Sequence, residues 1–200
     1  MFALIESGSI TKYLNGNKGI QLGDLKYPKA IYTLWTEAER NAIGIYEIVY
    51  DDTNKKDERW FINTNQSYAF ANSTVTATYG SATAKAHADA NFTEEDEDNG
   101  LGTEGELKSR GLKYKLIRDV KISAANELAK TDWYITRNAE KSTAIPSAIT
   151  THRDLVRSRQ AAMETSITNA SDTPALETLY TYTTDSDGVT SRPLAIIPKL

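Results

Sequence analysis

The stretch that decides the C-terminal half of the fold is "LAKTDWYITRNAEKSTAIPSAITTHRDLVRSRQ", residues 128–160, because it joins two helical patterns. The apolar positions before it recur every four residues, as on one face of an amphipathic helix: Leu112, Leu116, Val120, Ala124 and Leu128. Within the stretch, Pro146 suits the first turn of a second helix. The apolar positions of that second helix also follow near-helical spacing: Ile149, Val156, Met163 and Ile167. A connection of about fifteen residues between them predicts an antiparallel pair.

The triplet "TDW" at residues 131–133 has a structural and a functional interpretation. In the structural one, Thr131 and Asp132 bond backbone groups where the first helix ends, and Trp133 packs beneath the connection. In the functional one, Asp132 is a catalytic acid. No His or second carboxylate lies nearby with the spacing of a motif, so the structural interpretation is favoured. His152 has no companion His four residues away, which indicates a His at the edge of the core or on the surface.

The first 80 residues predict a β-rich docking domain. Short β-type runs, "FALIES" and "SITKYL", flank a Ser-Gly turn. Thr36, followed by Glu39 three positions later, has the pattern of a capping box at the start of a short helix. Gly44 ends that helix before the strand "IGIYEIVY". Residues 59–80, "RWFINTNQSYAFANSTVTATYG", predict two or three further strands, because they are rich in aromatic and β-branched side chains.

Residues 81–105 predict a linker, and residues 106–200 a second domain. "SATAKAHADANF" suits an extended segment or a weak helix, and "TEEDEDNGLGTEGE" suits a solvated acidic loop or hinge. The second domain holds the helical pair and a third short helix, with Thr173 as cap and Pro174 at its first position. Two short strands around Asp187 and Gly188 follow. The predicted fold class is α+β, a β-rich N-terminal domain followed by a C-terminal α-helical hairpin.

The composition argues against several classes of function. The chain has no Cys, which excludes disulfides, thiolate metal sites and Cys nucleophiles and fits assembly in a reducing cytoplasm. A net charge of −4 with interspersed acids and bases does not predict nucleic-acid binding. No apolar stretch approaches the ~20 residues of a membrane span. The acidic segment lacks the ligand spacing of a calcium loop, and no phosphate-binding, esterase or zinc-protease motif occurs. We therefore expect no enzymatic activity, no catalytic residue, no cofactor and no metal.

The supply of core residues is small for a chain of this length. Leu, Ile, Val and Phe account for 40 of the 200 residues, close to the level of about 20% below which disorder becomes a concern. Eleven Tyr and three Trp add to this apolar surface. Such a chain often gains further burial from partners, which favours a subunit of an assembly.

Two segments carry a resemblance to a known group of proteins. "GDLKYPKAIYTLWTEAERNAIGIYEIVYDD" resembles the N-terminal part of many bacteriophage tail and tail-fibre-associated proteins. In that group a YP-containing stretch precedes a short helix with an "ER…GI" ending and then a strand. The matching residues are Tyr27, Pro28, Glu39, Arg40, Gly44 and Ile45.

The second segment, residues 116–157, resembles the C-terminal helical region of the same group, which includes tail-fibre assembly-like proteins. That region has a helix ending in "L…TDW", a variable connection, and a Pro-led helix containing an R..LR pattern, here arranged as "RDLVR". The matching residues are Leu128, Thr131, Asp132, Trp133, Pro146, Arg153, Leu155 and Arg157. The two segments cover under half of the chain, and residues 60–105 match nothing in the group.

The resemblance implies a virion structural protein of the bacteriophage tail, a baseplate, adaptor or fibre-attachment component that acts by protein–protein binding. Its partners would be fibre, baseplate or tube and nozzle subunits, and further copies of itself, with no nucleic acid. The alternatives are a tail-fibre assembly chaperone and a host-surface carbohydrate-binding or hydrolytic module. The residues that we expect to stabilise the fold or bind partners are Trp35, Trp60, Tyr68, Phe70, Asp132, Trp133, Pro146 and Arg153.

Overall fold

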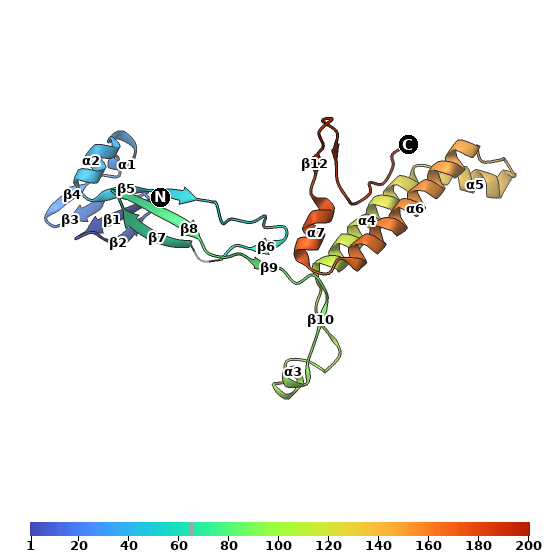
Figure 1. Ribbon diagram of the computed structural model, residues 1–200, viewed down its shortest axis with the longest axis horizontal. Coiled ribbons are helices and arrows are strands. Elements are labelled where there is room, and N and C mark those ends of the chain that lie inside the picture. The colour runs from blue at the N-terminus through green and yellow to red at the C-terminus, as the bar shows by residue number, and fades with distance from the viewer. Residues whose placement is uncertain (65) are drawn as a thin grey trace. The chain divides into compact units, whose positions relative to one another are not determined.

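The computed structural model describes residues 1–64 and 66–200, which form two compact units, Met1–Thr83 and Ala84–Leu200. The fold is α+β, with a β-rich half-barrel sheet in the first unit and helices in the second, as the sequence predicts. Figure 1 shows the elements of each unit. Among the described residues, no helix combines the length and apolar character that a membrane span requires.

The first unit is built on a five-stranded sheet. Its strands are β1 (Phe2–Glu6), β2 (Ser9–Leu14), β5 (Ile45–Asp51), β7 (Gln66–Ala71) and β8 (Thr74–Tyr79), in the order β2-β1-β5-β8-β7. The β5–β8 pair is parallel, and the β1–β2, β1–β5 and β7–β8 pairs are antiparallel. The predicted strands "FALIES" and "SITKYL" are confirmed, and a turn in which Ser7 and Gly8 both have positive φ joins them.

The sheet has apolar side chains on both faces. Neighbouring residues of a strand point to opposite faces, so Leu4 joins one buried cluster while Ala3 joins the other. The Leu4 cluster is completed by the hairpin of β3 (Ile20–Leu22) and β4 (Leu25–Tyr27) and by α1 (Ile31–Leu34). The two edge strands approach each other through Tyr13 and Tyr68, whose ring centroids are 4.7 Å apart. This contact gives the sheet its curled, half-barrel form.

A short helix, α2 (Glu37–Ala42), locks the connection into β5. The predicted capping box is confirmed, because the Thr36 hydroxyl accepts from the Glu39 N–H and the Glu39 carboxylate accepts from the Thr36 N–H. Buried Arg40 donates to the Trp35 carbonyl and forms an ion pair with Glu47 on β5, at 3.5 Å. The "ER" pair of the N-terminal motif, Glu39 and Arg40, therefore fixes the connection that leads into strand β5.

Residues 81–105, expected as a linker, contain short elements. Strand β9 (Thr83–Ala84) pairs with β6 (Phe61–Ile62), and β10 (Ala90–Asn91) pairs with β11 (Leu107–Ser109). Between β10 and β11 lies α3 (Glu94–Asp98), which has a capping box of Thr93 and Asp96. The pattern was not visible in the sequence because none of these elements is longer than five residues.

The second unit is organised by two antiparallel helices, α4 (Leu112–Ala129) and α6 (Ser147–Asn169). The start of α4 meets the end of α6 where Lys113 Nζ donates to the Thr168 carbonyl, at 2.9 Å. The end of α4 meets the first half of α6 where Arg153 donates to the Leu128 carbonyl. The predicted pair is confirmed, but its connection contains a helix that the sequence did not predict, α5 (Asp132–Lys141).

The chain after α6 folds back over the helical pair. Helix α7 (Thr173–Tyr180) is capped by Asp172, one residue before the predicted Thr173, because the Asp172 carboxylate accepts from the Ala175 N–H. The predicted strands around Gly188 are β12 (Thr183–Thr184) and β13 (Thr190–Ser191). Leu194 is buried, and its N–H donates to the Leu179 carbonyl.

A candidate protein-binding site at the helical corner

The corner between α4 and α5 is held by the guanidinium of Arg153 from α6. Arg153 Nη1 lies 2.8 Å from the Leu128 carbonyl, 2.7 Å from Thr131 Oγ1 and 2.9 Å from Asp132 Oδ1. Thr131 is fully buried, and its hydroxyl also donates to the Leu128 carbonyl. A charged donor that meets a buried hydroxyl, a half-buried carbonyl and an exposed carboxylate is a strong anchor. Four residues of the C-terminal motif therefore converge on one contact.

This contact explains Asp132 as a structural residue. The sequence predicted that Thr131 and Asp132 would bond backbone groups at the end of the first helix. That holds for Thr131, but the Asp132 carboxylate instead pairs with the Arg153 side chain. Asp132 also stands in the first turn of α5, where a negative charge interacts favourably with the helix dipole.

Trp133 contradicts its predicted place beneath the connection, because 51% of it is exposed. Asp132, the first residue of α5, is held by Arg153, and in this position of the helix the next side chain, Trp133, points outward. The Trp133 ring lies against the ring of Tyr134, with centroids 3.8 Å apart. The Arg137 guanidinium lies 4.7 Å from the Trp133 centroid and 5.4 Å from that of Tyr134. We call these three residues the α5 patch.

The α5 patch has the composition of a protein-binding surface. Trp, Tyr and Arg are the residues most enriched among those that dominate binding energy at interfaces. Arg137 follows Trp133 and Tyr134 by four and three positions, so the three side chains share one side of the helix. None of the ten residues of α5, all described by the structure, is buried. The helix therefore contributes almost nothing to the core of its own unit.

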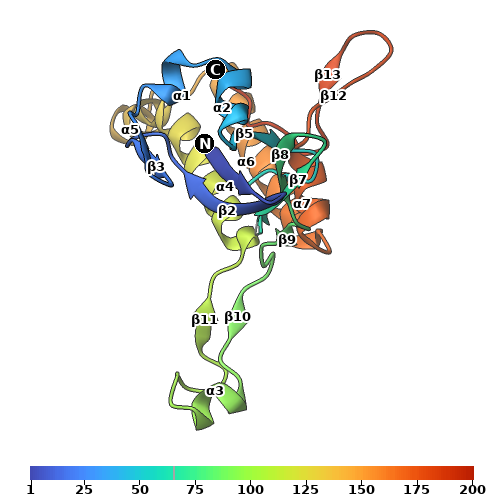
Figure 2. The same ribbon diagram turned by 90° about the vertical axis from the view of Figure 1, so that its left-hand side faces the viewer.

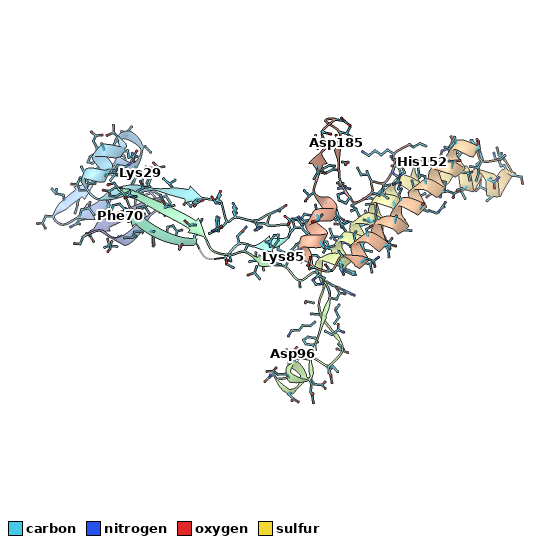
Figure 3. All side chains as sticks on the ribbon, viewed as in Figure 1. Lys29, Phe70, Lys85, Asp96, His152 and Asp185 are labelled. Atoms are coloured by element: carbon cyan, nitrogen blue, oxygen red, sulfur yellow. The ribbon has the colours of Figure 1, made fainter. Side chains whose placement is uncertain are left out.

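The other aromatic candidates are placed in or against the core of the first unit, where they stabilise the fold. Trp60 is only 3% exposed, and Trp35 packs against the Leu4 cluster. Tyr68 and Phe70 alternate along β7 with exposed residues, so both point inward against the Ala3 cluster. Figure 3 labels Phe70 on this strand. The alternation "SYAFA" was a visible signal of this inward placement.

Pro146 and His152 both contact other residues of the helical pair, and their contacts are explained by the fold. Pro146 is the residue that precedes α6, and its carbonyl accepts from the N–H groups of Ile149 and Thr150. His152, labelled in Figure 3, faces Glu127 of α4, with Nε2 3.3 Å from Oε1. This pair joins residues 25 positions apart, which no spacing rule in the sequence would connect.

Glu127 ties the end of the described chain to the hairpin. Its carboxylate accepts from Lys130 Nζ at 2.6 Å and from the Leu200 N–H at 2.8 Å. The bond from Lys130 and then the bond from Leu200 hold the pKa of Glu127 below its ordinary value. Glu127 is therefore an ionised acceptor with several donors, an arrangement that holds the C-terminal segment against α4.

Each unit has a concave region, and neither of these two regions is lined by a residue of the α5 patch. In the first unit, a pocket of about 520 Å³ is lined mainly by residues 12–21 of the β2–β3 connection. In the second unit, a pocket of about 360 Å³ lies between α6 and the segment that follows β13. Within residues 1–64 and 66–200, no three His, Asp or Glu side chains are grouped closely enough to hold a metal ion.

No family model matches the chain, and neither a curated protein nor a solved structure is similar to it.

Proposed function

We propose that this chain is a structural subunit of a bacteriophage tail, a baseplate, adaptor or fibre-attachment component that acts by protein–protein binding. The observation that carries the proposal is the α5 patch, in which the exposed ring of Trp133 stands beside half-buried Tyr134 and Arg137. The corner beneath it is anchored by Arg153, so the patch is presented on a fixed support. A preorganised aromatic and Arg cluster binds without the cost of ordering its side chains.

The residues of the resemblance support the same interpretation. In the C-terminal motif, Leu128, Thr131, Asp132 and Arg153 are joined by hydrogen bonds within the chain. Trp133 is the member of the triplet that takes no part in these hydrogen bonds, and its ring is half exposed. Its cluster with Tyr134 and Arg137 has the composition of a surface at which a partner binds.

The first test is the content of purified tail particles. A structural subunit is present in a stoichiometric amount, with other fibre, baseplate or tube and nozzle subunits as its neighbours. A tail-fibre assembly chaperone, the main alternative, acts on the fibre and is absent from the finished particle. Quantitative mass spectrometry of particles separates the two, and absence of the chain would overturn the structural role.

The second test addresses the α5 patch directly. Trp133→Ala and Arg137→Ala should each weaken capture of the chain's tail partner by roughly thirtyfold in Kd, the effect of losing about 2 kcal/mol at a dominant interface residue. The matched control is Tyr114→Ala, because the Arg110 guanidinium covers that exposed ring in the same way, at 4.2 Å. If the two patch variants bound the partner as tightly as the Tyr114→Ala control, the α5 patch would be excluded as the contact.

A host-surface carbohydrate-binding module remains the second candidate function, on one observation. The pocket of the first unit is lined by side-chain amides of Asn15, Asn17 and Gln21 beside the half-exposed ring of Tyr13. Amides and an aromatic ring suit a sugar. Binding of host polysaccharide by the purified chain, abolished by Tyr13→Ala and unaffected by Trp133→Ala, would favour this candidate.

A further inference from the structure

The pocket of the second unit is an apolar groove with a positive rim. Its apolar lining includes Leu155 from α6 and Tyr182, Leu194 and Ile196 from the C-terminal segment. Of these, Leu155, Tyr182 and Ile196 are substantially exposed. Two cations, Arg159 and Arg192, also line it. We call this region the C-terminal groove.

Neither cation of the C-terminal groove is neutralised by a carboxylate among the described residues. The two acids of α6, Asp154 and Glu164, pair with Arg157 and Lys121. Arg192 donates from Nε to the Leu194 carbonyl and lies over the rings of Tyr180 and Tyr182, which are neutral partners. The groove therefore combines exposed apolar surface with uncompensated positive charge, and it suits an acidic segment that carries an apolar side chain.

The same chain holds a segment of that chemistry. Residues 92–106, between β10 and β11, contain seven Asp and Glu residues and no Lys or Arg. Only Asp96, labelled in Figure 3, has a cation partner among the described residues, Lys108. Just after α3, Leu101 is 62% exposed. We call residues 92–106 the acidic tip.

The acidic tip is a formed structure. Thr93 and Asp96 cap α3, and the Leu101 N–H donates to the Asp96 carbonyl. Phe92 lies against Gly102, where any added Cβ would approach the ring to 2.5 Å. These contacts hold Leu101 and the acids of α3 in one fixed arrangement, so little conformational entropy would be lost when the tip binds.

We propose that the acidic tip of one copy of this chain docks into the C-terminal groove of a second copy. Leu101 enters among Leu155, Leu194 and Ile196, and acids of α3 pair with Arg159 and Arg192. The proposal goes beyond the proposed function, because it rests on the geometry of the second unit alone.

The groove that receives the acidic tip belongs to another copy. The base of the tip is bound to the start of α4, because the N–H groups of Leu112 and Lys113 donate to the carbonyls of Ala86 and His87. The start of α4 meets Thr168, 13 residues after Leu155 on α6, which is about 20 Å along the helix. From that base, β10, β11 and α3 lead away from α4 and α6 in both views (Figures 1 and 2).

If two copies exchange their acidic tips reciprocally, the contact closes as a two-fold dimer, and if each tip docks into the next copy, it generates a ring or a filament. The acidic tip is small, which places the contact among weak interfaces whose population depends on concentration. Its charges lie at the surface, so salt should weaken it. A repeated weak contact of this kind suits copies that are held together in a larger assembly.

The test is the self-association of the purified full chain, measured by sedimentation velocity over a wide range of concentration at low and at high salt. The wild-type chain should form dimers or larger species as concentration rises, and fewer of them at high salt. Arg159→Glu in the groove and the pair Glu94→Lys with Glu95→Lys in the tip should each abolish this association. These side chains are exposed, so the variants should fold, which far-UV circular dichroism verifies.

Mixing the two variants supplies the decisive arm. The Arg159→Glu variant keeps a native acidic tip and the tip variant keeps a native groove, so the mixture should associate although neither variant does alone. Arg159→Lys is the matched control and should retain association.

A wild-type chain that stays monomeric at every concentration, or variants that associate like wild type, would overturn the proposal. Normal self-association together with absence from tail particles would instead refute only the proposed function, and binding of the groove to another tail protein by a monomeric chain would replace the second copy with that partner.

Discussion

The guanidinium of Arg153 and the hydroxyl of Thr131 lie 2.7 Å apart across the helical pair, although 22 positions separate the two residues. Thr131 is fully buried and Arg153 nearly so, which makes this the best shielded contact of the corner. A buried donor that loses its acceptor pays its full desolvation cost. The contact therefore determines where α4 ends and where α5 begins.

Thr131→Val should destabilise the second unit by about 1–3 kcal/mol, because it removes the hydroxyl while keeping the shape of the side chain. Thr136→Val is the matched control, since the Thr136 hydroxyl donates to the Asp132 carbonyl on the exposed side of α5. The control should change the free energy of unfolding by no more than about 0.5 kcal/mol. Urea denaturation followed by helical circular dichroism measures both, and equal effects would exclude the proposed anchor.

Truncation of two tryptophans, Trp133 and Trp60, should separate an exposed from a buried position. Trp133→Ala should cost about 1 kcal/mol or less, because it loses a surface stack and no core. Trp60→Ala should cost about 3–5 kcal/mol, the usual effect of deleting a buried aromatic side chain. Thermal unfolding of the full chain compares the two, and a loss at Trp133 as large as that at Trp60 would show that α5 is packed.

The sequence predicted best where a pattern is local and repeated. The four-residue repeat from Leu112 to Leu128 predicted α4, and the Thr36 to Glu39 spacing predicted the capping box. Helix α5 was missed because its ten residues were taken as part of the connection between the two longer helices, although its apolar and polar residues are segregated at the helical period.

The candidate site was harder to predict than the fold, because its residues meet only in three dimensions. Arg153 was among the candidates through the resemblance, but its three acceptors come from the end of α4 and the start of α5. Trp133 was assigned to the core from the general burial of Trp. Its exposure follows from the direction that the Asp132 anchor gives to α5, which no property of Trp133 itself reveals.

Gly44→Ala tests a close backbone approach in the first unit. Gly44 has φ +79°, and a Cβ there would lie 2.7 Å from the Ile5 carbonyl oxygen on the neighbouring strand. Gly8→Ala is a matched control, because Gly8 has φ +78° and no atom within 4 Å of the added Cβ. Gly8→Ala should cost roughly 1 kcal/mol for the left-handed backbone alone. Gly44→Ala should cost at least about 1 kcal/mol more, the lower end of overpacking penalties, and chemical denaturation measures the difference. Equal costs would mean that β1 moves aside without strain.

The fastening of the C-terminal segment by Glu127 should depend on pH. The pKa of Glu127 is lowered in the folded chain, first by the bond from Lys130 and then by the bond from the Leu200 N–H. At an acidic pH the Glu127 carboxyl group is therefore protonated less often in the folded chain than in the unfolded chain. The resulting stability is fully present above the unfolded pKa of about 4.3 and is lost as pH falls through the lower folded value. Glu127→Gln should therefore flatten the decline of stability in this acidic range. Glu140→Gln, on the exposed face of α5, should leave the decline unchanged. Denaturation midpoints measured between neutral pH and about pH 3 compare the variants, and a Glu127→Gln profile that parallels the wild type would show that another carboxylate carries the acid sensitivity.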